Sequence, residues 1–99
     1  MKPVELDPEA SEELRQAIEY LESQRLGSGD EFEQAVQDAL DIIGKQPKAF
    51  APYRSRYRKY VITKFGYLIF YVELDDRNWV AAIANGKRRP GYWMNRQPN

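Results

Sequence analysis

The stretch that decides the fold reads YRKYVITKFGYLIFYVEL and runs from Tyr57 to Leu74. Both halves are rich in β-branched and aromatic residues, and Gly66 supplies a tight turn between them, so the stretch predicts a β-hairpin. A third run, Trp79–Ala84, follows a polar turn at residues 75–78. It extends the hairpin to an antiparallel meander over about residues 57–84.

Alternation along the second strand separates the two faces of this sheet. One face carries only apolar side chains and the other is mixed, so the sets are Leu68, Phe70, Val72 and Leu74 against Tyr67, Ile69, Tyr71 and Glu73. A purely apolar face needs a covering layer. We therefore expect helices over the first face, and water or a partner against the face that bears the tyrosines.

The first 45 residues supply the covering layer. Val4–Leu6 reads as a short edge strand, and Asp7 as N-cap with Pro8 in the first turn begins a helix. Apolar residues then recur at helical spacing to about residue 45. Gly27 is expected to end the first helix, and a capping box from Ser28 to Glu31 to begin the second.

These elements predict a single α+β domain over residues 1–99, in the order β-α-α-β-β-β. An N-terminal edge strand and an antiparallel helical hairpin (about residues 8–45) precede the strands, and the hairpin packs on one face of a mainly antiparallel β-sheet. Residues 47–56 read as a loop because they contain two prolines. Residues 85–99 form a basic, aromatic tail after the last strand.

The composition excludes several classes of function. The 99 residues contain no cysteine and no histidine, which excludes disulfides, thiolate chemistry, His- or Cys-based zinc sites and Ser–His triads. No cofactor or metal site is expected. There is no apolar run long enough to span a bilayer and no secretory signal at the N-terminus, so we expect a cytoplasmic protein with no membrane partner.

A net charge of zero conceals a separation of charge along the chain. Residues 1–44 carry twelve acidic and three basic side chains, and residues 45–99 carry three acidic and twelve basic ones. The acidic half is the predicted helical layer and the basic half is the sheet with its tail. Because the cations are interleaved with aromatic residues, this surface is suited to a partner that carries acidic side chains and apolar anchors.

The chain resembles the RelE/ParE superfamily of toxins from bacterial type II toxin–antitoxin systems. The likeness rests on the order of the elements, on the entry Arg58-Lys59 to a strand, on the hairpin of residues 64–71, and on the ending NGKRRPGYW of residues 85–93. ParE-like sequences commonly end a strand with His-x-x-Arg-x-Pro-x-Tyr-Trp. Here Asn85 stands in place of the histidine, and Gly66 stands where many members have proline.

The resemblance implies a toxin with one of two modes of action, and an antitoxin that wraps around the toxin and neutralises it. The first interpretation is a ParE-like toxin that stops growth, and stabilises plasmids, by binding DNA gyrase. The alternative is a RelE-like endoribonuclease, which cuts messenger RNA on the ribosome without a metal. A third class is a non-toxic remnant that keeps only antitoxin binding, and the departure at Asn85 adds weight to it.

Candidate site residues follow from the resemblance and from the charge pattern. In the ribonuclease interpretation, Arg58 and Arg88 stabilise phosphate charge and Tyr92 acts as an acid or contacts a base. In the binding interpretations, the target or antitoxin contacts are Arg58, Lys59, Tyr67, Tyr71, Asn85, Arg88, Arg89, Tyr92 and Trp93.

Simpler interpretations of the same residues stay open at this point. Arg58 and Arg88 can be surface arginines in ion pairs with Glu73 or Asp75. Tyr92 and Trp93 can simply pack the tail against the sheet. The Asn85-Gly86 pair is also a turn-forming dipeptide that can do no more than end the strand.

Overall fold

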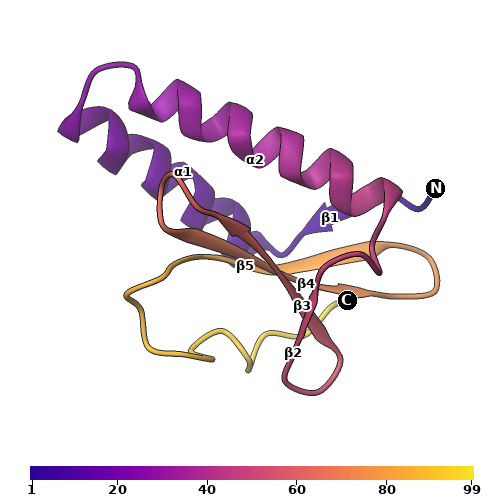
Figure 1. Cartoon of the computed structure of the whole chain (residues 1–99). Helices are drawn as coiled ribbons and strands as arrows, with labels where there is room; N and C mark the ends of the chain where they lie inside the picture. The colour runs from indigo at the N-terminus through magenta and orange to yellow at the C-terminus, as the bar shows by residue number, and fades with distance from the viewer.

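In the computed structural model, which describes residues 1–99, two helices lie on one face of a five-stranded sheet (Figure 1). The elements are β1 (Val4–Leu6), α1 (Pro8–Gln24), α2 (Ser28–Lys45), β2 (Ala51–Tyr53), β3 (Tyr57–Ile62), β4 (Tyr67–Glu73) and β5 (Asn78–Asn85). The strand order is β1-β5-β4-β3-β2, with β1 parallel to β5 and the other pairs antiparallel. The predicted α+β fold with an N-terminal edge strand is confirmed.

The start of α1 follows the sequence prediction. Asp7 is the N-cap, and its carboxylate accepts a hydrogen bond of 2.9 Å from the backbone N–H of Glu9. Pro8 occupies the first helical position, where the absence of an N–H group leaves no hydrogen bond unmade. The Asp7 N–H donates to the carbonyl of Val80 in β5, so the cap also joins α1 to the sheet.

The start of α2 differs from the sequence prediction. Gly27 adopts the left-handed conformation, with φ of 91°, but it is the N-cap of α2 and not the end of α1. The carboxylate of Glu22, in the last turns of α1, accepts hydrogen bonds of 2.9 Å from the N–H groups of Gly27 and Gly29. One helix therefore caps the next through a side chain.

The predicted capping box between Ser28 and Glu31 is wrong for this reason. Ser28 is already the first residue of α2 and is buried. With the helix start satisfied by α1, Glu31 is free to form ion pairs with Arg25 and with Lys64 from the turn between β3 and β4.

Protonation of Glu22 is expected to destabilise the helical hairpin. The hydrogen bonds from Gly27 and Gly29 lower the pKa of Glu22 below its ordinary value of 4.5. Because the folded protein has the lower pKa, this stabilisation is complete above pH 4.5 and is lost as the pH falls through the folded pKa. Thermal unfolding of Glu22→Gln and of the wild type should differ at pH 7 and converge as the pH falls below 4.5. A difference that does not depend on pH would contradict the assignment.

The helices cover the face of the sheet that bears the tyrosines, so the prediction of the opposite face is wrong. Tyr67, Ile69 and Tyr71 are buried in one core cluster with helical residues such as Phe32. Tyr71 can be placed there because its hydroxyl reaches the rim of the layer and donates a 2.7 Å hydrogen bond to the carbonyl of Pro47. Since both faces of the sheet are covered, alternation alone does not indicate which one faces the helices.

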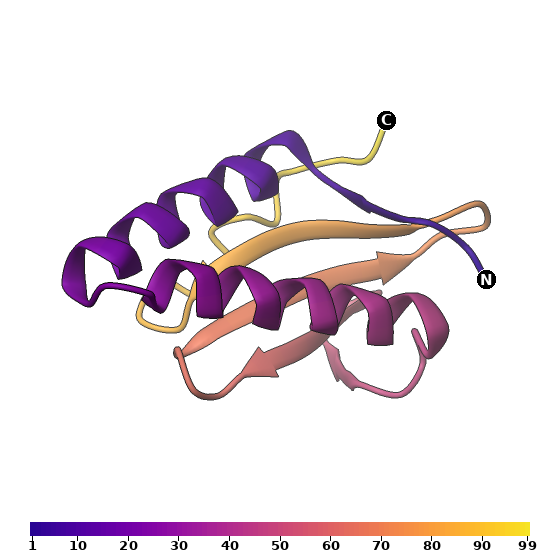
Figure 2. The same cartoon turned by 90° about the horizontal axis from the view of Figure 1, so that it is seen from above.

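The tail, residues 85–99, covers the other face of the sheet. In Figure 1 it passes on the side opposite the helices, which lie next to each other over the sheet in Figure 2. A second cluster of buried side chains forms beneath it and includes Phe70, Val72, Trp79 and Trp93. The tail therefore completes a third layer, and we call this side of the sheet the tail face.

A β-bulge in β5 changes which of its side chains face the helices and which face the tail. The pairing between β4 and β5 shifts between Phe70 and Tyr71, which lie opposite Ala82 and Val80. The extra residue, Ala81, is buried in the second cluster together with Ala82. The bulge lets Val80 pack against the helices while both alanines face the tail.

The strand β2 lies within the predicted loop of residues 47–56, where Pro52 argued against a strand. It pairs with β3 from Ala51 opposite Lys59 to Tyr53 opposite Tyr57. Proline is tolerated here because β2 is the edge strand of the sheet. This edge brings an aromatic residue, Tyr53, to the tail face.

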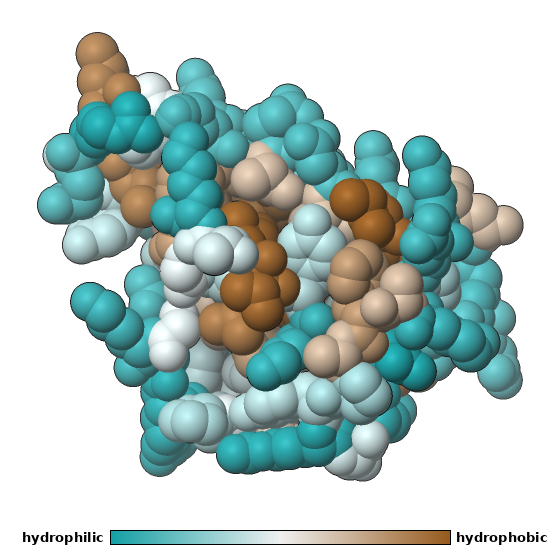
Figure 3. All heavy atoms as spheres, viewed as in Figure 1, coloured by the Kyte–Doolittle hydropathy of each residue, from teal (hydrophilic) through white to brown (hydrophobic).

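The face shown in Figure 3 exposes an apolar patch in its middle, surrounded by polar side chains. The exposed large apolar side chains of the chain are Met1, Tyr20, Leu26, Ile42 and Val61. Neither helix has a segment long and apolar enough to cross a membrane.

Candidate functional site

The tail is held on the sheet by an aromatic cluster around Trp93. This indole is 1% exposed and stacks on Phe70, with ring centroids 4.5 Å apart at an interplanar angle of 27°. Tyr57 meets it edge-on at 4.8 Å, and Tyr53 lies 6.0 Å away. The packing interpretation of Trp93 is what the structure shows.

A second attachment of the tail centres on the carboxylate of Glu13 in α1. Arg96 donates to both of its oxygens, at 2.9 and 3.1 Å, and the Tyr92 hydroxyl donates to Oε2. The same carboxylate accepts a 3.0 Å hydrogen bond from the backbone N–H of Ile83. Arg96 also donates to the carbonyl of Ala81. Glu13 and Arg96 therefore form hydrogen bonds with backbone groups on the edge of β5 that β1, which pairs only as far as Val80, does not reach.

Between these attachments the tail forms a basic loop, residues 85–91. Arg88 and Arg89 are exposed, and the guanidinium carbon of Arg88 lies 4.0 Å from the centre of the Tyr92 ring. Asn85 accepts a 2.9 Å hydrogen bond from the Lys87 N–H through its side-chain oxygen. Asn85 therefore has the turn-forming role that the sequence left open.

Eight of the fifteen lysine and arginine side chains form no ion pair. Seven of these lie in the basic loop or on the β2–β3 hairpin beside it, and six of the seven surround the tail face, because Arg58 lies opposite Tyr71 on the helix side. The eight are Lys45, Arg54, Arg56, Arg58, Lys59, Lys87, Arg88 and Arg89. The expected alternative of a pair with Glu73 does not hold, because Glu73 binds Lys2 and Lys48. The tail face thus carries an uncompensated positive charge.

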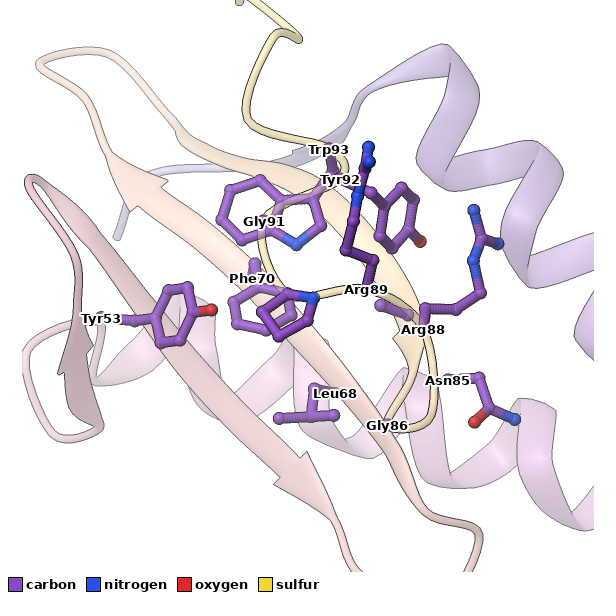
Figure 4. A pocket seen from close by; sticks show the side chains of 12 residues that line it. Tyr53, Leu68, Phe70, Asn85, Gly86, Arg88, Arg89, Gly91, Tyr92 and Trp93 are labelled. Atoms are coloured by element: carbon purple, nitrogen blue, oxygen red, sulfur yellow. The ribbon is translucent and has the colours of Figure 1, made fainter.

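A pocket of about 130 Å³ opens between the basic loop and the sheet (Figure 4). Leu68, Phe70 and Trp93 supply apolar surface, and Tyr53 stands on the side of β2. Arg88 and Arg89 are the charged residues that line it. The result is an apolar hollow with positive charge at its mouth.

Two of the predicted contact residues are not available to a partner. Tyr67 is 7% exposed and Tyr71 is 0% exposed, because both lie under the helices. Burial raises the pKa of the Tyr71 hydroxyl to about 12, against the opposing effect of the nearby Arg58. The expectation that the two tyrosines form a landing surface for the antitoxin is therefore wrong.

The structure also separates the residues proposed for RNA cleavage. Arg58 lies opposite Tyr71 and donates to the carbonyl of Phe50, whereas Asn85 lies opposite Tyr67. The two register positions are four residues apart on β4, about 13 Å. Arg58 therefore lies on the helix side of the sheet near the C-terminal end of β4, whereas the basic loop begins beside the N-terminal end of β4.

Tyr92 is committed to a structural contact. Burial is the main cause that raises the pKa of its hydroxyl, and the hydrogen bond to Glu13 adds to it. A tyrosine with a raised pKa, whose hydroxyl already donates a hydrogen bond to a carboxylate, is a poor general acid. Arg88 lies against the Tyr92 ring, whereas Arg58 lies apart from both in this structure.

Glu13 and Arg96 are the residues of this site that sequence reasoning missed. Glu13 follows Ala10 by three residues and precedes Ala17 by four, so it lies on the buried face of α1 among apolar residues. A carboxylate in such a position requires a partner, and this was the available signal. Its partner is 83 residues away, and nothing in the sequence identifies it.

No group of three acidic, histidine or cysteine side chains is placed to hold a metal ion. The functional features of the tail face are therefore its exposed cations, its apolar pocket and its two attachments to the body of the protein.

The comparisons with known proteins agree with this fold. A family model described as the ParE toxin of the type II toxin–antitoxin system parDE matches residues 4–90. Among solved structures, a chain of the chromosomal ParDE TA system from P. aeruginosa is similar, with a TM-score of 0.64 and 12% sequence identity. The match covers 86% of this chain and 96% of that chain. No curated protein sequence matches the chain.

Proposed function

This chain belongs to the ParE toxin family of type II toxin–antitoxin systems, and we propose that it stops growth in the cytoplasm by binding DNA gyrase. The observation that carries this proposal is the basic loop. Arg88 and Arg89 are exposed and form no ion pair, and the residues on both sides of them are fixed to the body of the protein. Such a surface is suited to binding an acidic surface of another protein.

Action by binding is favoured over messenger RNA cleavage. Cleavage through the 2′-hydroxyl needs a base, an acid and cations around one phosphate. Arg58 lies at the far end of β4 from the basic loop, and the Tyr92 hydroxyl donates to Glu13. Asn85 has no proton-accepting group at neutral pH, and its side chain holds a turn.

A cognate antitoxin is the second partner in this proposal. The solved relative is described as a ParDE system, in which toxin and antitoxin occur together. For the present chain we expect an acidic antitoxin, because the six unpaired cations around the tail face need compensating charge in a complex. Arg58, on the helix side, is not expected to take part in the same contact.

The double substitution Arg88→Glu with Arg89→Glu is expected to abolish growth inhibition. Both side chains point to solvent, so folding should be retained while the charge of the basic loop is reversed. Growth after induction without antitoxin measures the effect, and Lys45→Glu, at an unpaired cation of α2, is the matched control. Inhibition that survives the double substitution would contradict the role of the loop. A wild-type protein that is folded but harmless would indicate a remnant.

A further inference from the structure

The pocket beneath the basic loop has the size and lining of a receptor for one side chain. Its volume of about 130 Å³ is close to the ~150 Å³ of an apolar cavity that admits a benzene ring. Leu68 and Phe70 rise from β4, and Trp93 descends from the tail. An aromatic or branched aliphatic group that enters this space replaces water on an apolar surface.

The cations at the mouth of the pocket favour a partner that carries carboxylates next to the side chain that enters it. No carboxylate lines the pocket, whereas Arg88 and Arg89 do. On the opposite wall, the guanidinium carbon of Arg54 and the ammonium of Lys59 lie 5.3 and 5.7 Å from the ring centre of Tyr53. All four cations lack an ion pair, so carboxylates on both sides of an inserted anchor would find partners.

The pocket is formed before any partner arrives. Trp93 is fixed by its stack on Phe70, and the neighbouring Tyr92 is fixed by Glu13. Gly91 has a φ of 76°, a backbone conformation that favours glycine, and Nη1 of Arg54 lies close to it where the two walls meet. A preformed pocket spares the partner the cost of ordering this surface.

We propose that this pocket receives a single aromatic or branched aliphatic side chain from an acidic segment of the antitoxin. The inference rests on the proposed function to the extent that an antitoxin is the partner. Carboxylates on both sides of the anchor pair with Arg88 and Arg89 on one side and with Arg54 and Lys59 on the other. The segment then covers the loop that contacts the target, so neutralisation follows from direct obstruction of that loop.

The test fills the pocket and measures the affinity of the purified antitoxin from the neighbouring reading frame by calorimetry. Leu68→Trp places an indole in the pocket and is expected to weaken binding by at least tenfold. Ile42→Trp, on the exposed side of α2, is the matched control and should bind as the wild type does. Thermal unfolding verifies that each variant is folded. If Leu68→Trp is not, Ala84→Leu fills the same pocket from β5.

Charge is tested in parallel. Arg88→Glu with Arg89→Glu should weaken the complex by more than tenfold, and Lys45→Glu should not. Undiminished antitoxin affinity in the folded pocket-filled variants would overturn the proposal. So would a competing single-stranded DNA oligonucleotide that occupies the pocket in preference to the antitoxin.

Failure of the gyrase proposal would be seen separately. The same wild-type preparation is assayed for inhibition of DNA supercoiling by purified gyrase. If Leu68→Trp loses antitoxin binding and the wild type does not inhibit gyrase, the pocket proposal is supported and the gyrase proposal is contradicted. If the wild type inhibits gyrase and the pocket-filled variants bind the antitoxin as before, the gyrase proposal is supported and the pocket proposal is contradicted.

Discussion

Replacing Glu13 by alanine is expected to lower the free energy of unfolding by about 3 kcal/mol or more, the usual result of breaking a buried ion pair from one side. The change leaves Arg96, with a side chain only 9% exposed, facing the exposed Glu9 alone. It also removes the acceptor of the Tyr92 hydroxyl and of the Ile83 N–H. Urea unfolding measures the loss, which should also lower the melting temperature by on the order of 10 °C.

Two control variants separate the buried pair from the charge itself. Glu12 occupies the preceding position on α1 and pairs with Arg15 on the exposed side of the helix, so Glu12→Ala should change stability little. Glu13→Gln keeps an acceptor for Ile83 and should cost less than Glu13→Ala. Equal effects of Glu12→Ala and Glu13→Ala would show that the tail is not held through Glu13.

Replacing Trp93 by alanine is expected to cost about 3–5 kcal/mol, the range for truncating a large buried aromatic side chain. The indole is 1% exposed and contacts Phe70 and Tyr57, so its loss leaves a cavity under the tail. The helix-side cluster does not include Trp93, and far-ultraviolet circular dichroism should therefore stay close to that of the wild type. Denaturant unfolding followed by tyrosine fluorescence gives the free energy.

Tyr20→Ala is the matched control, because this aromatic residue of α1 is 57% exposed. Its truncation should change stability by about 0.5 kcal/mol or less. If Trp93→Ala were equally mild, the tail would not be part of the folded core, and the preformed pocket would lose its support.

The architecture was predictable because its signals are local. The Asp7-Pro8 helix start, the helical spacing of apolar residues and the turn at Gly66 each depend on neighbours in the chain. The element order, apart from β2, and the tail after β5 followed from them. The helix–helix link was predicted less well, because the N–H groups at Gly27 and Gly29 are satisfied by Glu22 from another helix.

The choice of sheet face was not predictable from alternation. Leu68 and Phe70 looked like the core, yet the core under the helices contains Tyr67 and Tyr71. The decisive fact is that the tail supplies a third layer, which depends on the long-range contacts of Trp93 and Arg96. Without those contacts, the tyrosine face reads as the open one.

The candidate site was predicted in part for the same reason. Arg88 and Arg89 lie on one basic loop, as their adjacency in sequence requires. Arg58 was grouped with them by charge and by family resemblance, but the strand register places it at the opposite end of β4. Tyr53 lines the pocket because it lies on β2, a strand that was not predicted because it contains a proline.

The most direct test of the central claim is an assay of the purified wild-type protein on two targets at matched concentrations. Purified gyrase is assayed for DNA supercoiling, and programmed ribosomes are assayed for cleavage of the bound messenger RNA. We predict that supercoiling is inhibited, that the message stays intact, and that Arg88→Glu with Arg89→Glu relieves the inhibition. Messages cut within codons on translating ribosomes, with supercoiling unaffected, would contradict the proposed function.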